Sequence, residues 1–215
     1  MNLYQSQKAY FKTAYEKEKT PWPNSNPTPQ VNEFLSIIKR NLPSGKMLDM
    51  GCGEGRHSAL FQENGFISFG VDYQPQALKK ALLRIREASG EKSGGPYFLA
   101  GDIFNLPFSP QNFDVILDYG CLHHIRKRDF KIYLGILLKM LKPGGFYILS
   151  CFSTGYKHYP GEKRTRDWLT HKGHYDRFFN QSEFPILFGA DFDMMRLLEE
   201  KEGIHEFFHV LMRKK

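Results

Sequence analysis

Short apolar runs alternate with amphipathic segments through the middle of the chain. The runs are nearly continuous in apolar residues, and their length suits strands that are buried on both faces. The segments between them repeat apolar residues every three or four positions, which is typical of helices that cover a sheet. This alternation predicts a parallel sheet with helices on both faces. The predicted strands are Met47–Met50, Phe66–Asp72, Tyr97–Gly101, Phe113–Asp118 and Phe146–Phe152.

Helix boundaries are marked by residues with special backbone geometry. The segment Arg56–Asn64 is predicted to be a helix that Gly65 ends in the left-handed region. Pro75 opens the next helix in its first turn. A further helix is predicted over Arg128–Leu141, and the run Lys142–Gly145 ends it.

The N-terminal part has a different pattern from the alternating middle. Leu3–Lys19 and Val31–Leu42 are predicted helices, and the prolines of the joint Pro21–Pro29 keep them apart. Residues 1–44 are therefore expected to form a helical cap ahead of the sheet.

The C-terminal third changes pattern again. Residues 153–180 are polar and aromatic, and we expect them to form a loop or lid. A short helix over Ser182–Phe188 precedes two strand-like runs, Phe192–Glu200 and His205–Arg213, which join at a turn over Lys201–Gly203. Residues 181–215 are thus expected to add a pair of strands.

Composition narrows the class of protein. Hydrophobic residues make up 41% and charged residues 25% of 215 residues, which is ordinary for a soluble domain with a single core. No apolar run approaches the roughly 20 residues that span a bilayer, and the N-terminus has no secretory pattern. We therefore expect a cytoplasmic protein with no membrane partner. The net charge of +7 permits an anionic partner, but the basic residues are spread out, which favours a solvated surface.

A glycine-rich turn joins the first predicted strand to its helix. It reads Gly51-Cys52-Gly53-Glu54-Gly55, and glycines let a ligand approach the backbone closely. A dinucleotide fingerprint needs a third glycine where Arg56 stands, and a phosphate loop needs a Gly-Lys-Ser/Thr run that is missing. The turn is therefore not suited to a pyrophosphate.

Two acidic residues end the neighbouring strands. Asp72 follows the second strand, where a carboxylate can accept hydrogen bonds from both hydroxyls of a ribose, and Tyr73 offers a face for adenine stacking. Asp102 follows the third strand and can accept from an adenine amino group while Ile103 packs on the ring. The alternative for both acids is a local capping role.

As a set, these motifs resemble those of class I S-adenosylmethionine-dependent methyltransferases. The matching runs, in order, are Leu48–Arg56, Val71-Asp72, Gly101-Asp102, Phe113–Ile116 and Leu141–Gly145. The resemblance implies that Gly51 and Gly53 contact the methionine end of S-adenosylmethionine, that Asp72 binds its ribose, that Asp102 binds its adenine, and that Asp49 lies near its amino group.

The resemblance also implies the fold and the division of the chain. We expect a Rossmann-like, seven-stranded, mostly parallel sheet with helices on both faces and an antiparallel last strand. The chain 1–215 is then one methyltransferase domain, with the cap, a cofactor-binding core over 45–152, a substrate lid and the strand pair. Thr20-Pro21-Trp22 and Asp118–His124 are also similar to the thiopurine and tellurite-resistance branch, whose acceptors are small thiols or chalcogens.

Methyl transfer from a sulfonium is an in-line displacement that needs no protein nucleophile. Asp118, after the fourth strand, is a candidate to face the sulfonium or the amino group of the cofactor. Tyr119 and His123 are candidates to orient the acceptor, and His124 is a candidate base; a packing role is the alternative for both histidines.

The sequence predicts no metal site. The pair His171 and His174 lacks a third ligand, and His205 and His209 fall on a predicted strand that separates them. The expected function is methylation of a small-molecule acceptor. Methylation of nucleic acid or protein is disfavoured because the amino-methylating tetrapeptide is missing, and a cofactor-binding module without activity is a third hypothesis. The acceptor atom and the oligomeric state are not specified by the sequence.

Overall fold

A computed structural model describes residues 2–20, 26–89, 94–201 and 206–215. Seven strands form one sheet in the order β3-β2-β1-β4-β5-β9-β8. Strands β1 (Gly45–Met50), β2 (Phe66–Asp72), β3 (Tyr97–Ala100), β4 (Phe113–Tyr119) and β5 (Leu141–Phe152) pair in parallel.

The strand pair β8 (Phe192–Glu200) and β9 (Phe207–Lys214) completes the sheet. Strand β9 is antiparallel to both β5 and β8, so it is the single strand with reversed direction among the seven. The predicted Rossmann-like sheet is confirmed. The predicted turn at Lys201–Gly203 lies mostly outside the described residues, as does His205.

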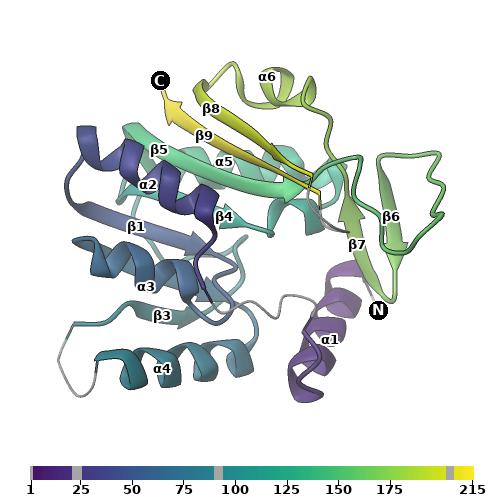
Figure 1. Cartoon of the computed structure of the whole chain (residues 1–215), viewed down its shortest axis with the longest axis horizontal. Helices are drawn as coiled ribbons and strands as arrows, with labels where there is room; N and C mark the ends of the chain where they lie inside the picture. Colours follow the sequence, from purple (N-terminus) through teal and green to yellow (C-terminus); the bar gives the residue numbers. More distant parts are fainter. Residues whose placement is uncertain (1, 21–25, 90–93, 202–205) are drawn as a thin grey trace.

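Helices cover the sheet on both faces, and each face has its own apolar core (Figure 1). On one face, α2 (Pro29–Asn41) and α3 (Arg56–Glu63) pack on β1, β4 and β5. On the other, α5 (Phe130–Met140) and α6 (Glu183–Phe188) pack on the same sheet. Helix α4 (Pro75–Ser89) contacts β2 and β3. No helix in the described part of the chain is long and apolar enough to cross a membrane.

Most predicted boundaries lie within two residues of the observed ones, and the largest difference is at the start of β5. Strand β5 begins at Leu141 rather than Phe146, because the chain pairs again with β4 across a register shift after Phe113. Two short 3-10 turns precede α5. The first, η1 (Leu122–His124), lies ahead of the helix predicted over Arg128–Leu141, and the second, η2 (Lys127–Asp129), takes the place of its first residues.

The expected lid contains a hairpin that the sequence analysis did not predict. Strands β6 (Trp168–His171) and β7 (His174–Arg177) pair antiparallel around Lys172 and Gly173, whose φ angles are 49° and 86°. Two consecutive positive φ values suit the twist of a two-residue hairpin turn. Helix α1 (Leu3–Glu16) contacts β7, and α1 and the hairpin lie together beyond the carboxyl ends of β1, β4 and β5 (Figure 1).

Candidate functional site

The glycine turn lies where the strand order reverses between β1 and β4, which is the position at which ligands bind in open parallel sheets. The φ angles of Gly51, Gly53 and Gly55 are 71°, 53° and 72°, so all three need the freedom of glycine. The backbone N–H groups of Gly51 and Cys52 donate to the carbonyl of Val71 at 2.8 and 3.0 Å. The turn is therefore tied directly to the end of β2.

Asp72 lies against this turn. Its Oδ2 accepts from the backbone N–H of Gly53 at 2.9 Å, and its Oδ1 accepts from that of Gln74 at 2.8 Å. Burial raises the pKa of this carboxyl group. The convergence of the glycine turn and the carboxylate, expected from the sequence, is thus present in the fold.

Asp49 is buried at the end of β1 on the α3 face of the sheet. Its Oδ2 accepts from the Ser58 hydroxyl at 2.7 Å. Burial raises its pKa to about 7, against the lowering effects of Ser58 and the Arg56 charge. A carboxyl group that titrates near neutral pH would gain from a cationic neighbour, because a positive charge favours its ionised form.

Three residues are predicted to bind adenine, Tyr73, Asp102 and Ile103, and they differ in their surroundings. Tyr73 packs under α1, with the Phe11 ring 6.2 Å away and the Lys8 ammonium 6.0 Å from its ring centre. Asp102 is exposed and accepts from the backbone N–H of Phe104 at 2.9 Å, which is the local turn that the alternative interpretation described. The Ile103 side chain is buried in the core of the α5 face. Contact of these residues with adenine stays a prediction.

Asp118 has structural partners for both carboxylate oxygens. Its Oδ1 accepts from the backbone N–H groups of Cys121 and Leu122 at 2.7 and 3.2 Å, and its Oδ2 accepts from the Tyr133 hydroxyl. The side chain is fully buried, and burial raises its pKa to about 6. This carboxylate holds η1 in place. Its contact with the cofactor stays a prediction.

Tyr119 and His123 are two of the three candidate catalytic residues, and each is held by contacts that limit what its side chain can do. Tyr119 points to the face opposite Asp118, as successive strand residues do, and its ring lies 4.9 Å from the Arg56 guanidinium. His123 stacks on Phe152 with ring centres 3.7 Å apart, and its Nδ1 accepts from the Phe152 N–H at 3.3 Å. Burial lowers the pKa of His123 well below its usual range, so the ring is neutral.

His124, the third candidate, meets a carboxylate that the sequence analysis missed. Its Nδ1 lies 3.0 Å from the Tyr175 carbonyl oxygen and 3.0 Å from Oδ1 of Asp176. Asp176 is fully buried in β7, and the Nε2 atoms of His158 and His174 each lie 3.0 Å from its Oδ2. Burial would raise the pKa of Asp176, but the three imidazoles hold it well below its usual range.

Helix α1 joins the glycine turn to this histidine cluster. The side chain of Gln7 donates to the carbonyl of His124 and accepts from the N–H of Tyr175, both at 3.2 Å. The Tyr15 hydroxyl lies 3.4 Å from where a Cβ on Gly53 would stand. Helix α1 therefore lies over the carboxyl edge of the sheet, which is the edge predicted to bind the cofactor.

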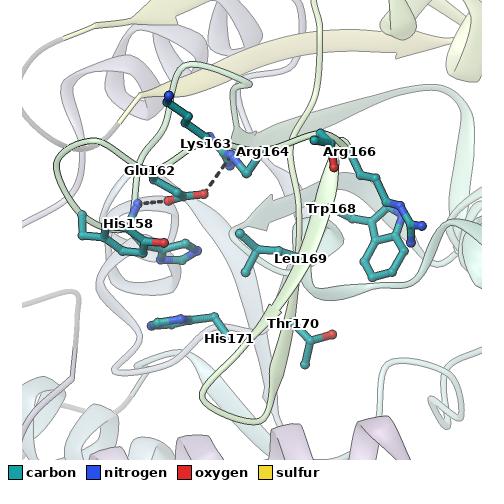
Figure 2. A pocket seen from close by; sticks show the side chains of 11 residues that line it. His158, Glu162, Lys163, Arg164, Arg166, Trp168, Leu169, Thr170 and His171 are labelled. Carbon is teal, nitrogen blue, oxygen red and sulfur yellow. Dashed lines mark hydrogen bonds and ion pairs between the residues drawn. The ribbon is translucent and has the colours of Figure 1, made fainter.

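A cavity of about 290 Å³ opens on the lid, between the hairpin and the segment before it (Figure 2). Cationic side chains of Lys163, Arg164 and Arg166 line it together with Trp168. His158 also lines it, so the cavity borders the cluster around Asp176.

Among residues 2–20, 26–89, 94–201 and 206–215, no group of three or more histidine, cysteine, aspartate or glutamate side chains is placed to hold a metal ion. His209 lies in β9, as predicted, and its ring nitrogens contact the Ser150 hydroxyl at 2.8 Å and the Glu200 carboxylate at 3.0 Å.

Sequence comparison gives a family match over most of the chain. Residues 41–202 match the model of a methyltransferase domain. An uncharacterized methyltransferase of Synechocystis is 27% identical over 50% of this chain and 47% of its own. A probable tRNA methyltransferase 9B of Bos taurus is 27% identical over 76% of this chain and 31% of its own. The chain thus spans less than half the length of these curated relatives.

Comparison with solved structures agrees on the fold. The 1,6-didemethyltoxoflavin-N1-methyltransferase of Burkholderia thailandensis, solved with S-adenosylhomocysteine, superposes with a TM-score of 0.75 and 23% identity over 98% of this chain and 88% of its own. This likeness covers α1 and the lid as well as the sheet. With the family match and the glycine turn at the switch point, it shows that the chain belongs to the class I S-adenosylmethionine-dependent methyltransferases.

Proposed function

We propose that this protein transfers a methyl group from S-adenosylmethionine to a small-molecule acceptor. The observation that carries the proposal is the covered carboxyl edge of the sheet. There the glycine turn and Asp72 meet, Tyr15 of α1 lies over the turn at Gly53, and the β6–β7 hairpin of the same chain packs against α1 and η1 (Figure 1). A covered edge suits a compact acceptor and helps to keep bulk water away from it.

The residues at this edge fit the cofactor. A Cβ on Gly51 would lie 3.4 Å from Cys121 and one on Gly53 would lie 3.4 Å from the Tyr15 hydroxyl, so a side chain at either position would occupy the space beside the turn. Asp49 would face an amino group and Asp72 a ribose, while Asp102 and Tyr73 would bind adenine. When bound, S-adenosylmethionine supplies a methyl group already activated by a positively charged sulfur.

With an activated methyl group, the protein's own task is positioning. The side chains must hold the acceptor in line and keep water out, and alignment of this kind supplies much of the acceleration in displacement reactions. The lid contributes aromatic surface and the 290 Å³ cavity, a size at the lower end for small-molecule sites. A cytoplasmic location is part of this proposal.

Nucleic acid is the second candidate acceptor. The name of the Bos taurus relative and the net charge of +7 favour it. The covered edge disfavours it, because a nucleotide would have to leave its strand and pass the lid to reach the cofactor.

Transfer of labelled methyl from S-adenosylmethionine into a cell extract separates the candidates. We expect label in the low-molecular-mass fraction and none in tRNA or protein. Label recovered in tRNA, and lost when salt is raised, would establish the second candidate instead. Calorimetric binding of S-adenosylhomocysteine with no label in any fraction would favour a cofactor-binding module without activity.

A further inference from the structure

Three imidazole rings contact one carboxylate in the lid. Asp176 is fully buried, and one nitrogen each of His124, His158 and His174 lies 3.0 Å from its oxygens. These histidines come from η1, from the segment before the hairpin and from β7. A buried carboxylate needs partners of this kind, because an isolated charge in the interior is costly.

The surroundings of His124 fix which of its nitrogens carries hydrogen. Its Nδ1 lies 3.0 Å from the Tyr175 carbonyl and 3.0 Å from the Asp176 carboxylate. Neither group has a proton to donate, so Nδ1 carries the hydrogen and Nε2 of the neutral ring keeps a lone pair. His123 is the reverse case, because its Nδ1 accepts from the Phe152 N–H and its hydrogen is on Nε2.

His124 also lies on the side of the cluster that faces the cofactor residues. The Phe11 ring of α1 packs on both His124 and Tyr73, with ring centres 5.1 and 6.2 Å apart. Cys121, in the same turn of chain, lies 3.4 Å from where a Cβ on Gly51 would stand. The side chain of His124 is 15% exposed and that of Asp176 is 0% exposed, so of the two groups only the imidazole is accessible.

We infer that Nε2 of His124 takes the proton of the methyl acceptor, and that Asp176 is the positioning residue that holds the imidazole for this step. The inference rests on the proposed function. It assigns the acceptor to compounds whose oxygen or nitrogen still carries its proton at neutral pH. As the acceptor atom bonds to the methyl carbon, its bond to hydrogen breaks and the proton passes to Nε2. The electron pair of the broken carbon–sulfur bond stays on sulfur, and the imidazolium later releases its proton to water.

The other groups around Asp176 suit this role. His158 and His174 contact its second oxygen, so its first oxygen stays directed at His124. Besides the three imidazoles, the titratable and charged groups of the described residues that act on Asp176 or feel its charge are Tyr10 of α1, His123 of η1, and Tyr156, Arg164 and His171 of the lid. Arg164 is a permanent cation, which helps to keep Asp176 ionised while His124 gains and loses its proton.

The tautomer of His124 can be read directly by long-range ¹H–¹⁵N spectroscopy of the wild-type protein, with no acceptor present. We expect the Nδ1–H form for His124 and the Nε2–H form for His123. In Asp176→Asn, an amide can donate to Nδ1, so we expect a mixture of tautomers at His124. His171→Gln is the control and should keep the wild-type tautomer, because His171 stacks on His158 and makes no ion-pair contact with Asp176. An Nε2–H form of His124 in the wild-type protein overturns the inference.

Phenol and thiophenol serve as probe acceptors, because phenol keeps its proton at neutral pH and thiophenol loses it. We expect His124→Gln and Asp176→Asn to slow methylation of phenol at least tenfold and that of thiophenol less than twofold. Equal slowing of both probes, or of neither, contradicts a proton-accepting role. If neither probe is methylated, the tautomer decides.

Calorimetry with S-adenosylhomocysteine on the same samples separates this inference from the proposed function. Binding with the wrong His124 tautomer rejects only the proton-accepting role. Absence of binding rejects the proposed function whatever the tautomer is.

Discussion

At the scale of single residues, burial decides what the acidic side chains at the carboxyl edge can do. Asp72 accepts from the glycine turn, Asp49 from Ser58, and Asp118 from η1 and Tyr133. Asp72 lies beside the glycine turn, and Asp49 lies in β1, the strand that leads into it. Asp118 instead holds the backbone that follows β4, at Cys121 and Leu122. From sequence position alone, all three acids were candidates to contact the cofactor, because each lies near the carboxyl end of a strand.

Replacement of Asp72 by alanine tests the glycine turn and the carboxylate together. We expect Asp72→Ala to weaken binding of S-adenosylhomocysteine by about 1–3 kcal/mol, because charged hydrogen bonds to the ribose are lost. Isothermal titration calorimetry measures this change. Lys12→Ala, on the exposed side of α1, is a suitable control, because its side chain is 59% exposed. Unchanged affinity in Asp72→Ala would remove this residue from the cofactor site.

The raised pKa of Asp49 predicts that the free energy of unfolding depends on pH. Its pKa is about 7 in the folded protein and about 3.8 when exposed, so folding is penalised as pH rises between these values and the penalty is constant above about 7. We expect Asp49→Asn to be more stable than wild type at pH 8 and nearly equal to it at pH 4. The difference is on the order of 1.4 kcal/mol for each unit of pKa shift. Thermal unfolding at both pH values measures it, and a difference that is the same at both contradicts the burial argument.

At the scale of elements, α1 and the hairpin lie together beyond the carboxyl ends of β1, β4 and β5 (Figure 1). The sequence analysis predicted the cap and the lid, and their division from the core stays a prediction. The hairpin was missed because β6 and β7 have four residues each, too few for a period-two pattern. Its turn also uses Lys172 at positive φ in place of the Asn-Gly or Asp-Gly pair that signals such turns.

Gln7 ties the cap to the site, so its removal should loosen α1. Gln7→Ala leaves the buried carbonyl of His124 and N–H of Tyr175 without their partner, which costs about 1–3 kcal/mol. We expect faster amide exchange in α1 and at Tyr175, with little change in β1 and β4. Lys12→Ala should leave exchange unchanged, since surface substitutions usually shift stability by less than about 0.5 kcal/mol. Uniform exchange across the chain in Gln7→Ala would contradict a local tie.

At the scale of the whole molecule, the order β3-β2-β1-β4-β5-β9-β8 brings the glycine turn, Asp72 and the histidine cluster to one edge. Parallel strands end at a common edge, and ligands of open parallel sheets bind at the point where the strand order reverses, here between β1 and β4. The family match and the superposition on a solved methyltransferase agree with this order of strands.

A ligand specific for the folded edge should stabilise the whole protein. S-adenosylhomocysteine at a hundredfold excess over its dissociation constant should add about 2.7 kcal/mol to the free energy of unfolding and raise the melting temperature accordingly. NAD should not, because Arg56 replaces the third glycine of the dinucleotide fingerprint. An equal rise with both ligands would place the binding outside the glycine turn.

The sequence by itself determined the alternating strands and helices, the glycine turn and the approach of Asp72 to it. These follow from local rules, since periodicity sets the elements, glycine sets the turn, and parallel connections place successive strand ends at one edge. Only the tertiary structure decided that Asp176 meets His124 and that Gln7, 117 residues before His124, joins them. Contacts between distant segments depend on how the cap and lid pack over the sheet, and no local pattern of apolar and polar residues specifies that packing.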